Sequence, residues 1–443
     1  MKNPFSKKRN NENGEDSGDS FYAKFAENVA RFFSAEPQKE KILRHEDFAG
    51  AGDTYYASVS ARYKVAQRIL TLLLVLFLLF SIFTNIKEIT YGNVFYFLRD
   101  FGNAVDLEST NYETLSYDVY QNQNFRLYRG GIAAISPSNV SVYTATGRRT
   151  LKSRSDFVTP YAVCSDKYVL VYDMSGTSFA LYNSFSKVYT ESFEYPITDA
   201  ALSDSGVFAV VTRSSDYKSV VCVYNKNIKL VGKYSKNLYA LDVAVDGAGE
   251  RMAVLFYDVG DGRGRTTVRV YDISSRQSND GRDADEDRII SEKIINYAFP
   301  LSCGFSDEGF LSVVTDSSVT VFDEEHEIYD SYGYNTEISA SYSGENGTAV
   351  AVKTGALNDV NRLVAFDKSG NLLYNEIIGE SVSEIELCGK YIFVKSDTGA
   401  VRVNTNNGEE EKYDCQSGKM LVYDESTAII CAESKAIYIK FTG

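Results

Sequence analysis

The pattern of hydrophobic and polar positions changes twice along the chain. Residues 69–86, ILTLLLVLFLLFSIFTNI, contain no charged side chain. A helix of this length rises about 27 Å, which matches the hydrocarbon thickness of a bilayer. The segment lacks the polar stripe of a core helix, and it starts too far from residue 1 for a signal peptide. The pattern therefore predicts one transmembrane helix. Its apolar surface includes Ile69, Leu72, Leu76, Leu79, Ile82 and Ile86.

The charges beside this segment predict its orientation. Arg62, Lys64 and Arg68 precede it without a nearby acid, whereas basic and acidic residues alternate after it. The positive-inside rule therefore places residues 1–68 in the cytoplasm and residues 87–443 outside the cell membrane. The tail carries a net charge of +2 and the remainder of the chain −16. An acidic outer domain is expected to stand away from anionic lipid.

The cytoplasmic tail is expected to have two parts. Residues 1–20 are polar and rich in Asn, Gly and Ser, which is typical of disorder. Residues 21–34 carry apolar side chains at helical spacing, which predicts a short amphipathic helix. This helix either docks on the inner leaflet or on a partner protein, or it has no dedicated role. Its predicted partner face consists of Phe21, Phe25, Val29 and Phe32.

Aromatic residues crowd the segment that follows the predicted membrane helix, residues 87–109. Tyrosine and phenylalanine rings favour the membrane–water interface, where one side is apolar and the other is wet. We expect an interfacial collar here, although the same rings would also suit packing against the base of the outer domain. The predicted interface residues are Tyr91, Phe95, Tyr96 and Phe101.

Residues 110–443 consist of short β-type runs that alternate with turn clusters and recur at a long period. Eight units can be aligned, with a mean period of 42 residues. Propeller blades of four strands have about this length. Helical repeats of similar period are excluded, because the runs are rich in alternating Val, Ile, Tyr and Phe. The units begin at Phe125, Pro160, Ile197, Leu241, Pro300, Glu337, Ser383 and Lys419.

The two ends of the repeat region predict how the ring closes. The final unit contains three clear strands, and a lone strand within residues 111–121 precedes the first full unit. Together they make one complete blade, which removes the open sheet edges that would otherwise pair with other molecules. The fold class is therefore predicted as all-β, an eight-bladed β-propeller preceded by one transmembrane helix. Seven blades are the alternative.

The units repeat the same turn chemistry. The first turn carries sequences such as Ser203-Asp204-Ser205-Gly206, and the third strand is predicted to end in pairs such as Tyr172-Asp173 and Phe366-Asp367. These aspartates either form a ring of ligands or bond the backbone of their own turns. We favour turn chemistry, because Asp and Ser stabilise turns and Gly supplies a positive φ.

Hairpins such as Val171-Tyr172-Asp173 followed by Gly176 resemble those of quinoprotein-like and WD-repeat-like propellers. The Trp that marks both kinds of repeat is absent throughout the chain. The overall plan is similar to that of an uncharacterised family of single-pass membrane propeller proteins in Gram-positive anaerobic bacteria. The resemblance covers nearly the whole chain, but its motifs are turn signals. It implies a fold and carries over no catalytic residue.

Composition excludes several classes of function. The net charge of −14 argues against a nucleic-acid binder, which needs a basic surface. The only histidines are His45, in the predicted cytoplasmic tail, and His326, in a predicted charged surface turn. Histidine-rich metal sites and HExxH hydrolases are therefore excluded. We expect no catalytic constellation, no cofactor and no enzymatic activity.

Six cysteines lie in the predicted outer domain, mostly within strands and without CxxC spacing. Zinc binding and thiol redox chemistry are therefore not expected. Equivalent positions in different blades are usually too far apart for a disulfide. We expect buried free thiols that act as small apolar side chains. The residues are Cys164, Cys222, Cys303, Cys388, Cys415 and Cys431.

Residues 274–286 form an irregular acidic insertion within the longest unit. Carboxylates at this density could bind calcium, but their spacing is not that of an EF-hand. A solvated excursion is the preferred interpretation. The calcium candidates are Asp280, Asp283, Asp285 and Asp287.

Three functions remain. The first is a binding or scaffolding propeller that is tethered to the membrane lipid through one helix and holds a cell-envelope protein or polymer. The second is a transmembrane ligand sensor, and the least favoured is a quinoprotein-like enzyme. We expect the first, because no catalytic constellation is visible in the sequence.

Overall fold

The computed structural model describes residues 63–64, 67–77, 79–80, 114–260, 262–274, 288–355, 360–415 and 417–441. The chain divides into two structural units, residues 1–89 and 90–443. In the first unit the described residues are helical, and Ile69, Leu72, Leu76 and Leu79 are exposed. Within the described residues, no helix has both the length and the apolar character needed to cross a bilayer. Ile82 and Ile86 lie outside the described residues.

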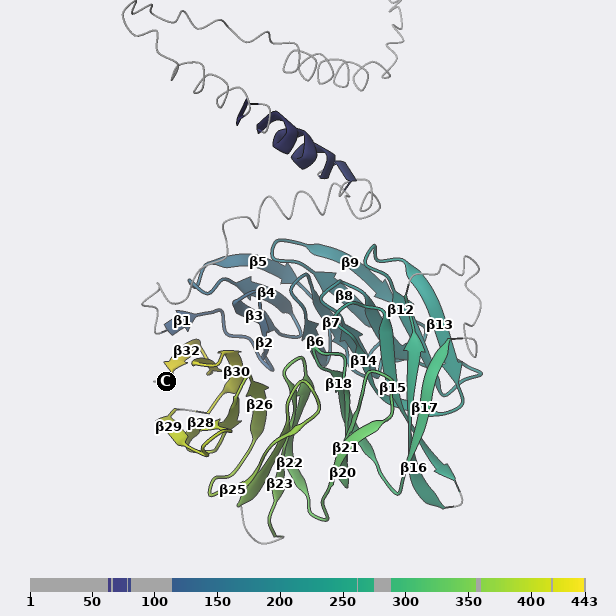
Figure 1. The fold of residues 1–443 in the computed structure, drawn as a ribbon, viewed down its shortest axis with the longest axis vertical. Helices are drawn as coiled ribbons and strands as arrows, with labels where there is room; N and C mark the ends of the chain where they lie inside the picture. Colours follow the sequence, from purple (N-terminus) through teal and green to yellow (C-terminus); the bar gives the residue numbers. More distant parts are fainter. Residues whose placement is uncertain are drawn as a thin grey trace, which may run out of the picture. The chain divides into compact units, whose positions relative to one another are not determined.

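The second unit consists of eight four-stranded antiparallel sheets, the blades of a propeller (Figure 1). Blade 1 comprises β2 (Asn124–Tyr128), β3 (Gly131–Ile135), β4 (Asn139–Tyr143) and β5 (Arg149–Arg154). Blade 2 comprises β6 (Pro160–Cys164), β7 (Val169–Asp173), β8 (Ser178–Tyr182) and β9 (Lys187–Ser192). Blade 3 comprises β10 (Asp199–Leu202), β11 (Phe208–Thr212), β12 (Ser219–Tyr224) and β13 (Leu230–Lys236). Blade 4 comprises β14 (Tyr239–Val245), β15 (Arg251–Gly260), β16 (Arg263–Asp272) and β17 (Ile289–Asn296).

The other four blades follow in chain order. Blade 5 comprises β18 (Pro300–Phe305), β19 (Leu311–Thr315), β20 (Ser318–Phe322) and β21 (Ile328–Gly333). Blade 6 comprises β22 (Ile338–Gly344), β23 (Gly347–Lys353), β24 (Asn361–Phe366) and β25 (Leu372–Ile378). Blade 7 comprises β26 (Glu384–Cys388), β27 (Tyr391–Lys395), β28 (Gly399–Asn404) and β29 (Glu410–Asp414). Blade 8 comprises β30 (Lys419–Asp424), β31 (Thr427–Cys431), β32 (Lys435–Lys440) and β1 (Thr114–Ser116).

The prediction of eight blades is confirmed, and so is the closing strand. β1 pairs antiparallel with β32, with Leu115 opposite Ala436. The first strand of each blade starts within two residues of the predicted unit boundary. Successive hydrophobic clusters fill all eight contacts between neighbouring blades, including the contact between blades 8 and 1. The ring is therefore closed by packed side chains as well as by one strand pair.

The sequence pattern of each strand reflects its place in the blade. Second strands such as β7 and β11 are buried at every position, since neighbouring blades cover both of their faces. The fourth strands are the last in the order of each sheet, and β5, β9 and β25 follow the outer edge of the ring in Figure 1. β17 alternates between half-buried and exposed positions. This difference explains why inner runs are continuously apolar while outer runs alternate.

Strand direction defines two ends of the propeller. Within each antiparallel blade, the turn between the first and second strands lies at the same end as the turn between the third and fourth. We call this the AB end. The remaining turn and the linker to the next blade lie at the opposite end, which we call the BC end. β1 runs towards the BC end.

Turn chemistry at the AB end is as predicted. The carboxylates of Asp246, Asp323 and Asp367 accept backbone N–H bonds from their own turns, as in the 2.9 Å bond from Glu327 to Asp323. Gly206 takes a φ of 88°, which its turn requires. These aspartates therefore stabilise turns.

One strand assignment was wrong. Tyr172-Asp173 ends the second strand of blade 2, because the third strand ends at Tyr182 and Asn183 follows it. The side chain of Asn183 accepts N–H bonds within that turn, from Phe185 at 2.9 Å and from Ser186 at 2.8 Å. An asparagine thus serves here where blades 4, 5 and 6 use Asp272, Asp323 and Asp367.

Candidate binding surfaces of the propeller

Side chains on the innermost strands bond to the backbone of the next blade and form a girdle around the ring axis. Each first strand is a sheet edge with unpaired backbone groups. Arg126 Nε donates to the Ala162 carbonyl oxygen at 2.9 Å, crossing from blade 1 to blade 2. Between blades 7 and 8, Glu384 Oε2 accepts the Met420 N–H at 2.8 Å. The girdle therefore satisfies edge groups that no strand pairs.

Two carboxyl groups of the girdle lie side by side. Asp199 Oδ2 accepts the Val243 N–H at 2.9 Å, and Asp242 Oδ2 accepts the Cys303 N–H at 2.7 Å. The Tyr172 hydroxyl donates to Asp199 Oδ1 at 3.2 Å. Burial, and then the neighbouring charge of Asp242, raise the pKa of Asp199 well above its usual range. Burial also raises the pKa of Asp242. Like charges in this position disfavour double ionisation, so the pair holds one proton to a higher pH than an isolated carboxyl group does.

Two further carboxyl groups near the axis also favour the neutral form. Burial raises the pKa of Glu386 to about 7. Burial, followed by the charges of Asp204 and Asp307, raises the pKa of Glu345 to about 7. Asp204 belongs to blade 3 and Glu345 to the AB turn of blade 6, yet the two carboxyl groups are close enough for the charge of Asp204 to act on Glu345. Carboxyl groups from distant blades thus meet at the AB end.

These polar groups serve the structure of the ring. The bonds of Asp199, Asp242 and Glu386 run to backbone N–H groups of the neighbouring blade. Among the described residues, no three histidine, cysteine or carboxylate side chains are grouped so that they could hold a metal ion. These carboxyl groups can bind and release protons, so the stability of the ring depends on pH.

The prediction of a charged surface position for His326 is wrong. The residue does lie in the turn after β20, with a φ of 63°, but its side chain is only 3% exposed. Burial, and then the charge of Arg251, lower the pKa of this imidazole. The three neighbouring glutamates predicted a solvent-exposed side chain, whereas the turn places the imidazole in the protein interior.

The six cysteines are free, as predicted, and three of them are buried. Burial raises the pKa of each thiol, to about 12 for Cys164 and Cys222 and to about 11 for Cys388. Protonated thiols of this kind are poor nucleophiles. They act as small apolar side chains within the blades.

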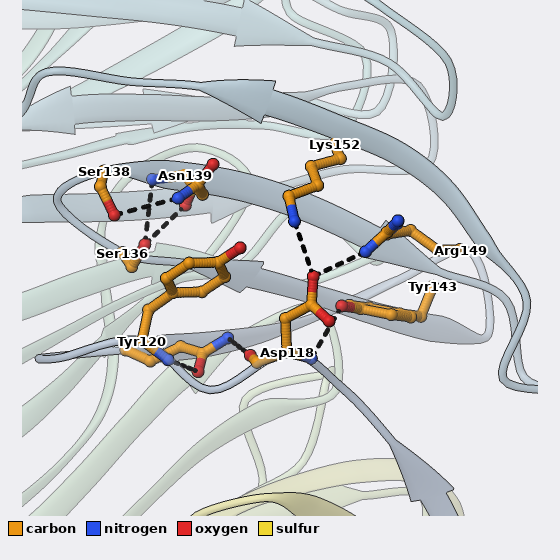
Figure 2. A network of polar contacts seen from close by, with 9 residues as sticks. Asp118, Tyr120, Ser136, Ser138, Asn139, Tyr143, Arg149 and Lys152 are labelled. Atoms are coloured by element: carbon orange, nitrogen blue, oxygen red, sulfur yellow. Dashed lines mark hydrogen bonds and ion pairs between the residues drawn. The ribbon is translucent and has the colours of Figure 1, made fainter.

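The junction of blades 8 and 1 carries an open pocket of about 600 Å³. The chain between β1 and β2, with Tyr120, and Phe125 of β2 form one wall, and the segment before β30 forms another. Asp118 fixes this connection, as Figure 2 shows, by bonding Arg149 Nη1 at 2.6 Å and Lys152 Nζ at 2.9 Å. The ammonium group of Lys152 also lies 5.7 Å from the centre of the Tyr120 ring. The network positions the connection that closes the ring.

The BC end of blades 3–5 carries exposed aromatic rings with a cation beside each of three tyrosines. Lys218 Nζ lies 4.7 Å from the Tyr239 ring centre, and Arg263 Cζ lies 5.1 Å from that of Tyr297. We call this the tyrosine–cation surface. It consists of Tyr195, Arg213, Lys218, Tyr239, Arg263, Tyr297 and Phe299.

The long hairpin of blade 4 supports this surface. Its strands β15 and β16 each have ten residues, whereas the corresponding strands of blade 5 have five. The Tyr257 ring on this hairpin packs against Phe299 at a centroid distance of 5.0 Å. Tyr297 is 63% exposed and has a φ of 61°, an unusual conformation for a bulky residue. Such strain accumulates at sites with a function beyond folding.

Sequence reasoning missed this surface. The predicted Phe face of residues 21–34, the collar with Tyr91, Phe95, Tyr96 and Phe101, and the calcium candidates Asp280, Asp283, Asp285 and Asp287 all lie outside the described residues. The insertion itself falls between β16 and β17, as expected. The available signals for the missed surface were the unusual length of the hairpin and the Tyr-Ala-Phe linker that precedes Pro300.

The fold and its surfaces define an eight-bladed β-propeller with a closed ring. Residues 107–440 match a family of unknown function, DUF5711, so the chain belongs to that family. No curated protein matches the sequence.

Several solved structures are similar to the propeller. BamB from Moraxella catarrhalis has 12% sequence identity and a TM-score of 0.48, with 74% of this chain and 100% of that chain covered. Hydrazine synthase of Kuenenia stuttgartiensis has 10% identity and a TM-score of 0.42, with 65% and 97% covered. The Pan2 WD40 domain of Neurospora crassa has 10% identity and a TM-score of 0.42, with 64% and 90% covered.

Proposed function

We propose that the chain is a membrane-tethered binding module, without enzymatic activity, whose propeller holds a cell-envelope partner outside the cell. The tyrosine–cation surface is the observation that carries this proposal. Exposed apolar patches bordered by polar groups mark interaction sites, and Tyr, Phe and Arg are enriched at such sites. Tyr239 is 53% exposed and Phe299 is 42% exposed, in a chain of net charge −14.

The rigidity of the propeller favours a binding role. Each blade packs against both of its neighbours, so the turns at the BC end are presented in fixed relative positions. A preorganised surface loses little conformational entropy when a partner binds. The polar groups near the ring axis bond the backbone, which leaves the BC end of blades 3–5 as the distinctive surface.

The apolar segment 69–86 supports membrane tethering. Its described residues are helical, and large apolar side chains such as Leu70 (70% exposed) and Phe77 (67% exposed) are exposed within the described part of the chain. An uncharged run of this length partitions into lipid. The basic residues before it favour a cytoplasmic N-terminus.

Fractionation of cells that express the full-length chain tests the tether. The chain should remain in carbonate-washed membranes, and the variant L72D/L76D should shift to the soluble fraction. Protease added to intact cells should cleave the propeller if it faces outward. A chain that washes off membranes, or a propeller protected until the cells are lysed, would contradict this part of the proposal.

Purification of the full-length chain in mild detergent tests the binding role. The proposal predicts a partner that remains bound at a defined stoichiometry, whereas a chain that purifies alone under every mild condition would count against it. Turnover of a substrate by the purified chain would replace the binding role with an enzymatic one.

A further inference from the structure

The cations of the tyrosine–cation surface are available to a partner. Within the described part of the chain, Arg213, Lys218 and Arg263 make no ion pair with a carboxylate. Arg263 instead donates a hydrogen bond to the Tyr297 hydroxyl. By contrast, nearby Asp258 is paired with Arg265 at 3.1 Å. Among the residues that the structure describes, the three cations of this surface therefore have no anionic partner.

Two leucines extend the apolar part of the surface. The inner strands β14 and β18 each contain a bulge, at Leu241 and Leu301, where one residue is left out of the strand pairing. Their exposed fractions are 37% and 42%. Bulges change the direction of a side chain and often lie at functional sites. Because β14 and β18 are adjacent, both leucines lie beside the linker that carries Tyr297 and Phe299.

Resting on the proposed binding function, we infer that the tyrosine–cation surface binds an acidic polypeptide segment with aromatic or aliphatic side chains. Carboxylates of the segment pair with Arg213, Lys218 and Arg263, and its apolar side chains pack on the exposed rings and on the bulged leucines. Charge complementarity of this kind steers association and selects partners. Apolar anchors at the centre supply most of the binding energy.

Segments of this chain fit the surface less well. The acidic insertion after Ser274 joins the third and fourth strands of blade 4, so it starts and ends at the AB end. Residues 1–68 carry a net charge of +2, which does not complement the cations. The occupant is therefore expected to be another protein.

A library of random 16-residue peptides, displayed on phage and selected on the full-length chain in detergent, tests the inference. Enriched peptides should combine Asp or Glu with Tyr, Phe, Leu or Ile. Their affinity should fall several-fold between 50 and 300 mM NaCl, since exposed ion pairs are screened. The variant K218A/R263A should lose about tenfold in affinity, as should Y239A/Y297A.

A matched control is available at the AB end. Lys167 lies over the Tyr168 ring and Lys390 over the Tyr391 ring, each at 5.3 Å, so K167A/K390A removes two similar pairs from the opposite end. This variant should bind the peptides within about twofold of the parent chain, and thermal unfolding checks that all variants fold.

Other outcomes overturn the inference. Enrichment of neutral or basic peptides, or binding that K218A/R263A leaves unchanged, would refute it while leaving the proposed binding function intact. Tight binding to purified peptidoglycan or to phosphatidylglycerol vesicles that depends on the same residues would assign the surface to a polymer or to lipid. Failure of all probes, together with a chain that purifies without a partner, would refute the proposed function itself.

Discussion

Replacing Glu386 with glutamine should stabilise the protein at alkaline pH and leave its stability unchanged at acidic pH. Glu386 lies half-buried on β26, and its Oε2 accepts the Val422 N–H at 3.4 Å. Burial raises the pKa of this carboxyl from 4.5 to about 7, although the charges of Lys419 and Arg126 oppose the rise. Glutamine has the same shape and keeps an acceptor for Val422, but it cannot ionise.

The sign and size of the effect follow from proton linkage. A carboxyl with a raised pKa in the folded state contributes stability that is complete below about pH 4.5 and is lost as the pH rises through 7. The rise in pKa corresponds to about 3 kcal/mol when the group is fully ionised. Because Glu386 is only half-buried, solvent screening lowers this to roughly 1–2 kcal/mol. E386Q should therefore gain roughly 1–2 kcal/mol at pH 8.5 and close to nothing at pH 4.

Urea unfolding of the full-length chain, followed by circular dichroism and tyrosine fluorescence, measures this difference. Comparing the parent chain with E386Q at the same pH cancels the contributions that Asp199, Asp242 and His326 make to the unfolding free energy. Glu384 provides the control on the same strand, since E384Q breaks an ion pair with Lys419 at 3.2 Å and should gain no stability at pH 8.5. If E386Q is destabilised equally at both pH values, the carboxyl is ionised in the folded state and the reasoning fails.

Three further predictions concern the ring and its thiols. G131A should lose roughly 2–4 kcal/mol of unfolding free energy, since its Cβ would lie 2.0 Å from the Tyr143 carbonyl oxygen; a loss below 1 kcal/mol would contradict this. L115A in the closing strand should lower the unfolding free energy by roughly 2–4 kcal/mol, because it removes a buried side chain. D118A loses only exposed ion pairs and should lower it by at most about 1 kcal/mol. If urea unfolding shows the reverse order, packed side chains do not close the ring. Ellman's reagent at pH 7.5 should react with the six thiols only after denaturation, and rapid labelling of the folded chain would show an accessible thiolate.

The ring could be predicted from the sequence because its information is local and repeated. Each blade has turns that bond their own backbone, as Asp246 and Asp367 do, and second strands such as β11 contain a continuous apolar run. The closing strand around Leu115 followed from counting strands in the final unit. The turn and strand patterns of one blade are weak signals, but their recurrence in eight units identifies the repeat even without a Trp in the chain.

The binding surface could not be predicted, because its residues meet only when blades pack. Tyr239 is the first residue of β14 and Lys218 comes from a turn of the preceding blade, so their spacing in the sequence is not periodic. Tyr297 adopts a φ of 61°, a conformation that sequence reasoning assigns to Gly or Asn. The bulge at Leu241 shifts the strand register by one residue, which reverses the alternation on which burial predictions depend.

The girdle of carboxyl groups was missed for a related reason. Asp199 and Asp242 are separated by a whole blade in the sequence, and each sits in an otherwise apolar strand. Only the ring brings them together, and only their contact with the next blade explains why a carboxyl is tolerated there.

Photo-crosslinking in intact cells tests most directly whether the BC end of blades 3–5 holds a partner. Tyr239 would be replaced with p-benzoylphenylalanine in the full-length chain, and Tyr329, 49% exposed on the outer strand of blade 5, would be replaced as the control. The account predicts a discrete crosslinked species from position 239, sensitive to K218A/R263A, and none from position 329. Crosslinking from position 329 alone, or from neither position, would contradict it.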